Sequence, residues 1–446
     1  MKRIPALLVA LMFLQPVFPH YKARYHVIID TDGGVDDFRA ICLMLASPEI
    51  EVIAITTVDG VLTPGITAEK VGVLLNRFGH EGIPVGTGTE VLPLVLKSIA
   101  LEDMPVDFVA LGPLSNLGAV LHKSPEIASL IRRLYWYNRD GATEDFNHAV
   151  DPQAASDVLQ SAISIDFVSA EGFIPGSPVQ LIPALDTIPS RYAPALRDFF
   201  TGAPGDDCIP LYLLYPDNFY VSAAGTGDSP AGPERNEAIL KSDADPVSMV
   251  MDILENDRED KSIIFSSFPA DPLFFREDVS IIAGEIIKKH GLKEWKIVVL
   301  TNEFHEHLGI YSILGAKMGL RAREYFNVGI DELGIVSYAG TTPPVSCLND
   351  GLQVSTGATL GHGTIRLAED NSFPVKGQFI PMARFTFKNQ VIEISIKKEI
   401  RDKIHEDVSQ GVKSFGLESP EYWAYIRKLA LRYWLELNRM DIFEIE

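Results

Sequence analysis

The first half of the chain alternates between short apolar runs and amphipathic segments, and this alternation constrains its fold most strongly. Runs rich in Val and Ile predict buried strands at residues 26–30, 51–58, 106–111, 134–137 and 163–169. Apolar residues at helical spacing predict helices between them, at residues 36–45, 68–78, 113–121 and 152–160. The pattern predicts an α/β fold, with an open, mostly parallel sheet flanked by helices on both faces. Binding sites in such sheets lie beyond the carboxyl ends of the strands.

The second half has a different character. A helix ending at residue 290 and a strand at residues 296–301 precede a region rich in His and Gly, and an antiparallel pattern follows near residues 384–396. A strongly apolar helix at residues 422–437 fits a core or a domain interface. Because 446 residues exceed what one core accommodates, we expect a second, α+β domain. We place the boundary at residues 275–290, which gives domains of residues 23–280 and 285–446.

Acidic residues outnumber basic ones, and the formal net charge is −21. Such a field repels a phosphate backbone, which argues against a nucleic acid polymer as a partner and favours a small neutral ligand or a cation. The three cysteines, Cys42, Cys208 and Cys347, are too few and too scattered to predict a disulfide framework.

The start of the chain has the pattern of a secretory signal. Lys2 and Arg3 precede an apolar run at residues 4–14, which is too short to span a bilayer. We therefore expect residues 1–22 to be a signal peptide and the protein to be periplasmic or secreted. The alternative is a buried first strand in a cytoplasmic protein. No later segment predicts a transmembrane helix.

Four carboxylates crowd into eight residues after the first predicted strand: Asp30, Asp32, Asp36 and Asp37. They would repel one another unless a cation or protons compensated their charge. Oxygen ligands suit Ca²⁺ or Mg²⁺ better than Zn²⁺. Asp36 and Asp37 could instead cap the following helix, but capping does not explain Asp30 at the end of the strand.

Residues 30–37 (DTDGGVDD) closely resemble the DTDPGxDD signature of nucleoside hydrolases, with Gly33 where the family usually has Pro. Three further stretches resemble the family in the same order: ITTV at residues 55–58, LGPLSNL at residues 111–117, and DFN followed by DPQAA at residues 145–155. The resemblance spans roughly residues 25–260. It implies hydrolysis of the N-glycosidic bond of ribonucleosides or related ribosides. It also implies a homo-oligomer formed through the first domain, a contact that the second domain could block.

The resemblance also implies a calcium site. Asp30 and Asp37 would bind Ca²⁺ with the backbone carbonyl of Ser115 and a later aspartate. An ungapped match favours Asp206 for that aspartate, with Asp207 as the alternative.

Catalytic and sugar-binding roles follow from the same resemblance. Asp36 would act as the general base on the attacking water, while Asp32, Asp145 and Asn147 would bind the substrate, the last two through the sugar hydroxyls. Carboxylates suit this reaction because positive charge develops on the sugar in the transition state.

The sequence departs from the family in the part that contacts the base. Val61 replaces the usual Asn after the second strand, and the usual His near Asp206 is missing. His148 could supply the lost acid, or it could be a packing residue. The alternative function is therefore a nucleoside-binding or sugar-sensing protein that keeps the cation pocket without turnover.

The second half resembles another family. Residues 304–319 (FHEHLGIYSILGAKMG) and 346–363 (SCLNDGLQVSTGATLGHG) resemble two blocks of the E-type family within formylmethanofuran dehydrogenase. His305, His307 and Cys347 are donors that Zn²⁺ accepts, with Asp350 and His362 as further candidates. The alternative is a Gly-rich turn with hydrogen-bonded histidines.

Overall fold

The structure is a computed structural model that describes residues 23–138, 143–169, 177–188, 190–199, 205–224, 233–255, 264–369, 380–417 and 419–446. The predicted signal peptide, residues 1–22, lies outside the described residues. Within the described ranges, no helix is long and apolar enough to cross a membrane.

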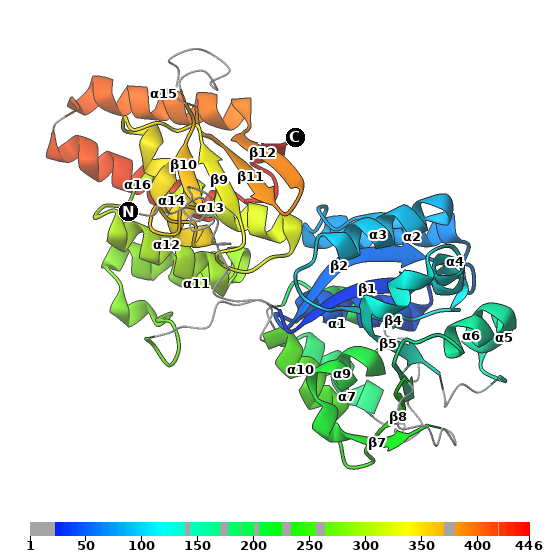
Figure 1. Cartoon of the computed structure of the whole chain (residues 1–446). Helices are drawn as coiled ribbons and strands as arrows, with labels where there is room; N and C mark the ends of the chain where they lie inside the picture. Colours follow the sequence, from blue (N-terminus) through cyan, green and yellow to red (C-terminus); the bar gives the residue numbers. More distant parts are fainter. Residues whose placement is uncertain are drawn as a thin grey trace, which may run out of the picture.

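Among the described residues of the first half, eight strands form one sheet in the order β3-β2-β1-β4-β5-β6-β8-β7 (Figure 1). All neighbouring strands are parallel except β7, which runs antiparallel to β8. The strands are β1 (Tyr25–Thr31), β2 (Ile50–Thr57), β3 (Val85–Thr87), β4 (Val106–Ala110), β5 (Ile131–Tyr137), β6 (Ile165–Ser169), β7 (Phe219–Ala223) and β8 (Arg235–Leu240). This confirms the predicted α/β class.

Both faces of this sheet are buried. In β1, Val27 and Ile29 belong to one apolar core and Ile28 to another, because successive side chains of a strand point to opposite faces. The helices that supply the two cores are α1 (Val35–Ala46), α2 (Pro64–Phe78), α3 (Val91–Ala100), α4 (Ser115–Lys123), α5 (Phe146–Val150), α6 (Pro152–Leu159), α7 (Ser177–Leu185), α8 (Ala193–Asp198), α9 (Cys208–Leu214) and α10 (Pro246–Glu255). The carboxyl ends of the parallel strands therefore meet at one edge of the sheet, and their amino ends at the other.

The second half has its own sheet and core. The strand order is β10-β9-β11-β12-β13 within the described residues, and only β9 and β10 pair in parallel. These strands are β9 (Gly334–Ser337), β10 (Ile365–Leu367), β11 (Met382–Phe387), β12 (Gln390–Ile396) and β13 (Phe443–Ile445). The helices are α11 (Glu277–His290), α12 (Leu292–Phe304), α13 (Ile310–Phe326), α14 (Leu348–Thr356), α15 (Lys398–Phe415) and α16 (Pro420–Glu436). The predicted second α+β domain is confirmed, and Phe268 and Phe275 already pack against its core.

One predicted element is wrong. Residues 296–301 form part of the helix α12, not a strand. The β-branched run there resembles a strand, but the buried positions Trp295, Val298 and Asn302 recur every three to four residues. The helical spacing buries this face against the neighbouring helices.

Polar contacts join the two domains. His80 Nδ1 lies 2.6 Å from the backbone oxygen of Glu324, and Arg321 pairs with Glu81 at 2.7 Å. Arg191 of the first domain also pairs with the buried carboxylate of Glu324. Burial by itself would raise the pKa of Glu324, but Arg191 and Arg439 lower it well below its usual range. The charges at this boundary are thus matched across it.

Candidate active site at the carboxyl edge of the parallel sheet

Asp30 lies near the end of β1 and is fully buried. Its Oδ1 accepts hydrogen bonds from Thr56 Oγ1 at 2.6 Å and from Asn116 Nδ2 at 2.8 Å. Its Oδ2 is buried and has no hydrogen-bond partner among the described residues. Burial raises the pKa of Asp30 to about 7, despite the hydrogen bonds from Thr56 and Asn116. One oxygen is therefore held in place while the other remains available to a ligand.

Asp37 lies in the first turn of α1 and is also buried. Its Oδ2 accepts a hydrogen bond from Thr31 Oγ1 at 2.5 Å and further ones from the backbone N–H groups of Asp32 and Gly33, at 3.1 and 3.2 Å. Burial, reinforced by the charge of Asp32, raises the pKa of Asp37 to about 7. These bonds orient its carboxylate as the bonds from Thr56 and Asn116 orient Asp30.

Asp206 precedes α9 and completes a cluster with Asp36 and Asp37, in which one oxygen of each lies within 4.8 Å of the others. Burial and the charge of Asp37 raise the pKa of Asp206 well above its usual range, and its Oδ1 has no hydrogen-bond partner among the described residues. The alternative candidate, Asp207, instead pairs with Arg39 at 3.1 Å. The structure therefore brings Asp206 into the cluster and directs Asp207 elsewhere.

Glycines let the chain approach these carboxylates closely. A Cβ atom at Gly60 would lie 2.2 Å from Asp32 Oδ2, and one at Gly205 would lie 2.1 Å from Asp36 Oδ2. The Asp32 carboxylate accepts hydrogen bonds from the backbone N–H groups of Gly34 and Val61, both at 3.2 Å. Asp32 is thus fixed by the backbone around it, and the position of Gly205 has no space for a side chain.

The residues present fit a calcium ion. Asp30 Oδ2 and Asp206 Oδ1 are buried oxygens without partners in the described parts of the chain, and three carboxyl groups here have raised pKa values. Buried carboxylates without a compensating charge are unfavourable, and an oxygen-only donor set suits Ca²⁺. Ser115 is the first residue of α4, beside Asn116, which holds Asp30.

The other predicted site residues lie around α5. Asp145 caps this helix by accepting a hydrogen bond from the backbone of Asn147 at 2.9 Å. Asn147 Nδ2 donates to the backbone oxygens of Leu111 at 3.1 Å and Tyr137 at 3.4 Å, which links the ends of β4 and β5. The His148 ring stacks on Trp136, with ring centres 6.3 Å apart. Its role as an acid stays a prediction.

Sequence reasoning missed the residues that orient the acids, namely Thr31, Thr56 and Asn116. Asn116 lies within the LGPLSNL stretch, and Thr56 is the register partner of Asp30 on β2. Both could have been selected by asking which polar residues end the strands beside β1. Further buried polar atoms without hydrogen-bond partners in the described residues belong to Thr57, Asn138 and Ser169, at the carboxyl ends of β2, β5 and β6.

The predicted zinc donors of the second domain come only partly together. His305 Nδ1 lies 2.6 Å from Asp350 Oδ2, and the rings of His305 and His307 are 4.1 Å apart. Cys347 is half-buried, directly before α14, and among the described residues it does not join a group of three close donors. His362 instead lies 3.3 Å from Asp331. The zinc site therefore stays a prediction.

Comparisons with known proteins agree with this geometry. The family model of inosine-uridine preferring nucleoside hydrolases matches residues 27–104 and 92–174, and a model described as FmdE, of the molybdenum formylmethanofuran dehydrogenase operon, matches residues 304–430. The pyrimidine-specific ribonucleoside hydrolase RihA of Citrobacter koseri is 31% identical over 251 residues, which cover 43% of this chain and 80% of that protein. RihA of Salmonella schwarzengrund is 30% identical over the same shares of both chains.

Among solved structures, a plant nucleoside hydrolase is 19% identical, with a TM-score of 0.45, covering 52% of this chain and 99% of its own. The sequence relatives and the two family models identify both halves of the molecule. The chain belongs to the nucleoside hydrolase family, whose members are hydrolases acting on N-glycosyl bonds, and it carries an FmdE-like domain after the hydrolase domain.

Proposed function

We propose that this protein hydrolyses the N-glycosidic bond of ribonucleosides or related ribosides in a calcium-dependent reaction, and that its C-terminal domain is a metal-binding module. The observation that carries the proposal is the set of buried carboxylate oxygens without partners in the described residues at the carboxyl edge of the sheet, namely Asp30 Oδ2 and Asp206 Oδ1. Family membership supports the reaction class.

In this proposal, Asp30, Asp37 and Asp206 hold the cation. When bound, it supplies positive charge that orients the sugar hydroxyls and increases the acidity of the attacking water. Thr31, Thr56 and Asn116 keep the carboxylates in place through the hydrogen bonds described above. This arrangement is preorganised, so little reorientation is needed during the reaction.

Asp36 acts as the general base in this proposal. It is half-buried, whereas Asp30, Asp37 and Asp206 are buried, so among these acids it is the most accessible to water. It would take the proton of the water that attacks the anomeric carbon while the bond to the base breaks. The surrounding carboxylates stabilise the positive charge that develops on the sugar.

The experiment uses the full chain, a panel of purine and pyrimidine ribonucleosides, and a measurement of free ribose. We expect release with calcium and loss of release after chelation, with recovery when calcium is returned. Absence of release from every substrate at saturating calcium would contradict the proposal.

A second function is favoured by Gly205, which lies so close to Asp36 that no side chain fits where the family commonly has a histidine. A protein without that acid could bind nucleosides without cleaving them. Thermal stabilisation by a nucleoside without ribose release would identify such a binding protein. Cleavage with His148 intact and its loss in His148→Ala, with nucleoside binding retained, would instead assign the acid to His148.

A further inference from the structure

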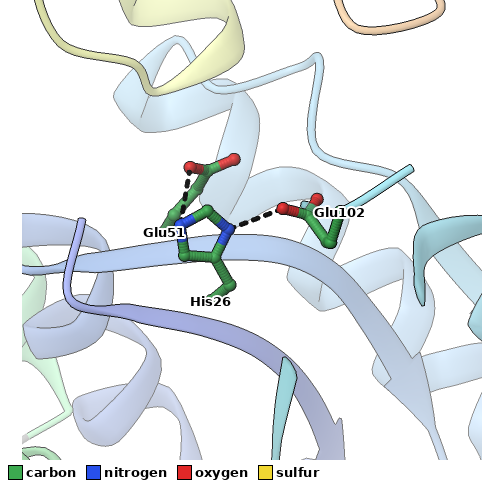
Figure 2. A group of neighbouring side chains, drawn as sticks. All are labelled: His26, Glu51 and Glu102. Carbon is green, nitrogen blue, oxygen red and sulfur yellow. Dashed lines mark hydrogen bonds and ion pairs between the residues drawn. The ribbon is translucent and has the colours of Figure 1, made fainter. Parts of the chain in front are cut away.

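A second group of buried titratable side chains lies at the opposite edge of the parallel sheet. His26 is near the start of β1, Glu51 is near the start of β2, and Glu102 lies shortly before β4 (Figure 2). One donor atom from each lies within 4.8 Å of the other two. His26 and Asp30 are four residues apart along β1, or roughly 13 Å at the rise of a strand. The group is therefore separate from the candidate active site.

The imidazole of His26 is oriented as in many metal sites. Its Nδ1 lies 2.6 Å from Glu102 Oε2, and a hydrogen bond from Nδ1–H would leave the lone pair on Nε2. Nε2 is buried, has no hydrogen-bond partner in the described residues, and lies 3.8 Å from Glu51 Oε2. The side chain is only 3% exposed. Figure 2 shows the ring between the two carboxylates.

A cation from the second domain already occupies the space between these carboxylates. Lys388, in the turn between β11 and β12, places Nζ 2.7 Å from Glu51 Oε1 and also contacts Glu102 Oε1. One ammonium and a neutral His26 leave this group with a net charge of −1. A divalent ion in place of the ammonium would bring the net charge to zero.

A cavity of about 350 Å³ adjoins the group and is lined by residues of both domains. His26, Glu51, Glu102 and Lys388 all contribute to its wall. The Lys388 side chain is 23% exposed, so its flexible stem has a route to solvent if the ammonium leaves.

We propose that His26, Glu51 and Glu102 form a site for a divalent transition metal ion of the zinc class, and that Lys388 is the cation displaced when this metal binds. A mixed imidazole and carboxylate donor set favours Zn²⁺ over Ca²⁺ or Mg²⁺. Because Lys388 belongs to the second domain, metal binding exchanges an ion pair between the domains for a bond set within the first.

The test titrates Zn²⁺ and Co²⁺ into the chelated full-length protein in the presence of saturating calcium, and it measures affinity by calorimetry and bound equivalents by elemental analysis. We expect His26→Asn to lose one equivalent relative to wild type. Lys388→Met keeps the three donors and removes the competing ammonium, so we expect zinc to bind this site at least threefold more tightly. Lys398→Met removes an exposed lysine on α15 and is the matched control, with no change expected.

Two results would overturn the proposal: equal zinc equivalents in wild type and folded His26→Asn, or unchanged zinc affinity in Lys388→Met. If His26→Asn does not fold, Glu51→Gln replaces it in the count of equivalents, and Lys388→Met still tests the site with its donors intact. Either negative result assigns the group to an ion-pair network between the domains. Hydrolysis is not read in this test, so its outcome is independent of the proposed function.

Discussion

The two edges of the parallel sheet both bury carboxylates, but they compensate the charge differently. At the amino edge, Glu51 and Glu102 contact Lys388 and His26. At the carboxyl edge, Asp30 and Asp206 each keep a buried oxygen without a partner in the described residues. The pKa of Glu102 is lowered despite its burial, whereas burial raises the pKa values of Asp30 and Asp206. Acids with a built-in cation stabilise the fold, and acids without one require a ligand.

The largest expected effect separates the base from the acids around it. Asp36→Asn should lower kcat/KM for ribonucleosides by roughly 10²- to 10⁴-fold, because the amide cannot accept the proton of the attacking water. Calcium affinity should change much less than turnover. Asp217→Asn, at an exposed carboxylate in a short turn before β7, is the control and should leave both unchanged. Equal turnover in Asp36→Asn and wild type would remove Asp36 from the mechanism.

The pH dependence of stability should expose the uncompensated acids of the carboxyl edge. In the chelated protein, Asp30 and Asp37 have pKa values of about 7, against 3.8 for an ordinary aspartate. Between these values the folded state holds more protons than the unfolded chain, so stability should fall as pH rises from about 4 to 7. The effect is on the order of 4 kcal/mol per carboxyl group.

Saturating calcium should remove this loss, because the ion replaces the protons. Calorimetric unfolding at pH 5 and pH 8, with calcium and with chelator, measures the effect. A chelated protein that is equally stable at both values would show that these carboxyls are already compensated from within the chain.

Removing the built-in cation should make the amino edge behave like the carboxyl edge. Lys388→Met leaves Glu51 and Glu102 buried without their ammonium, and we expect a loss of about 3 kcal/mol in the free energy of unfolding. The measurement is thermal unfolding next to Lys398→Met, an exposed lysine whose loss should cost almost nothing. Equal stability of the two variants would mean that His26 alone balances the two glutamates.

The smallest effect concerns the support of the calcium ligands. Asn116→Ala removes the amide that donates to Asp30 Oδ1 at 2.8 Å, and it should weaken calcium binding by roughly 10- to 100-fold. Asn116→Asp removes the same donor and adds a negative charge, which separates loss of orientation from gain of charge. Calcium titration followed by thermal shift measures both variants. Unchanged affinity in Asn116→Ala would place the support of Asp30 on Thr56 alone.

Local patterns predicted the α/β fold because β1 and its neighbours are buried on both faces, and such strands have continuous apolar runs. The clustering of Asp30, Asp36 and Asp37 was also predictable, because they lie within eight residues. The strand predicted at residues 296–301 was wrong because packing between helices outweighed the β-branched composition of α12.

Contacts between distant parts of the chain could not be predicted. Lys388 lies more than 280 residues from both Glu51 and Glu102, and no local pattern marks it as their partner. The support of Asp30 by Asn116 depends likewise on the parallel pairing of β1 with β4, which brings the start of α4 to the end of β1. Such pairs follow from topology, and topology was predicted here only as a class.

The matched charges at the domain boundary bear on how this protein can be dissected. Glu324 depends on Arg191 from the other half of the molecule, and Glu51 and Glu102 depend on Lys388. A truncated fragment ending after α10 would carry naked acids on one flank and lose their counter-ions. Recombinant halves should therefore dissolve and fold less well than the intact fusion, and biochemical work is best done on the undivided polypeptide.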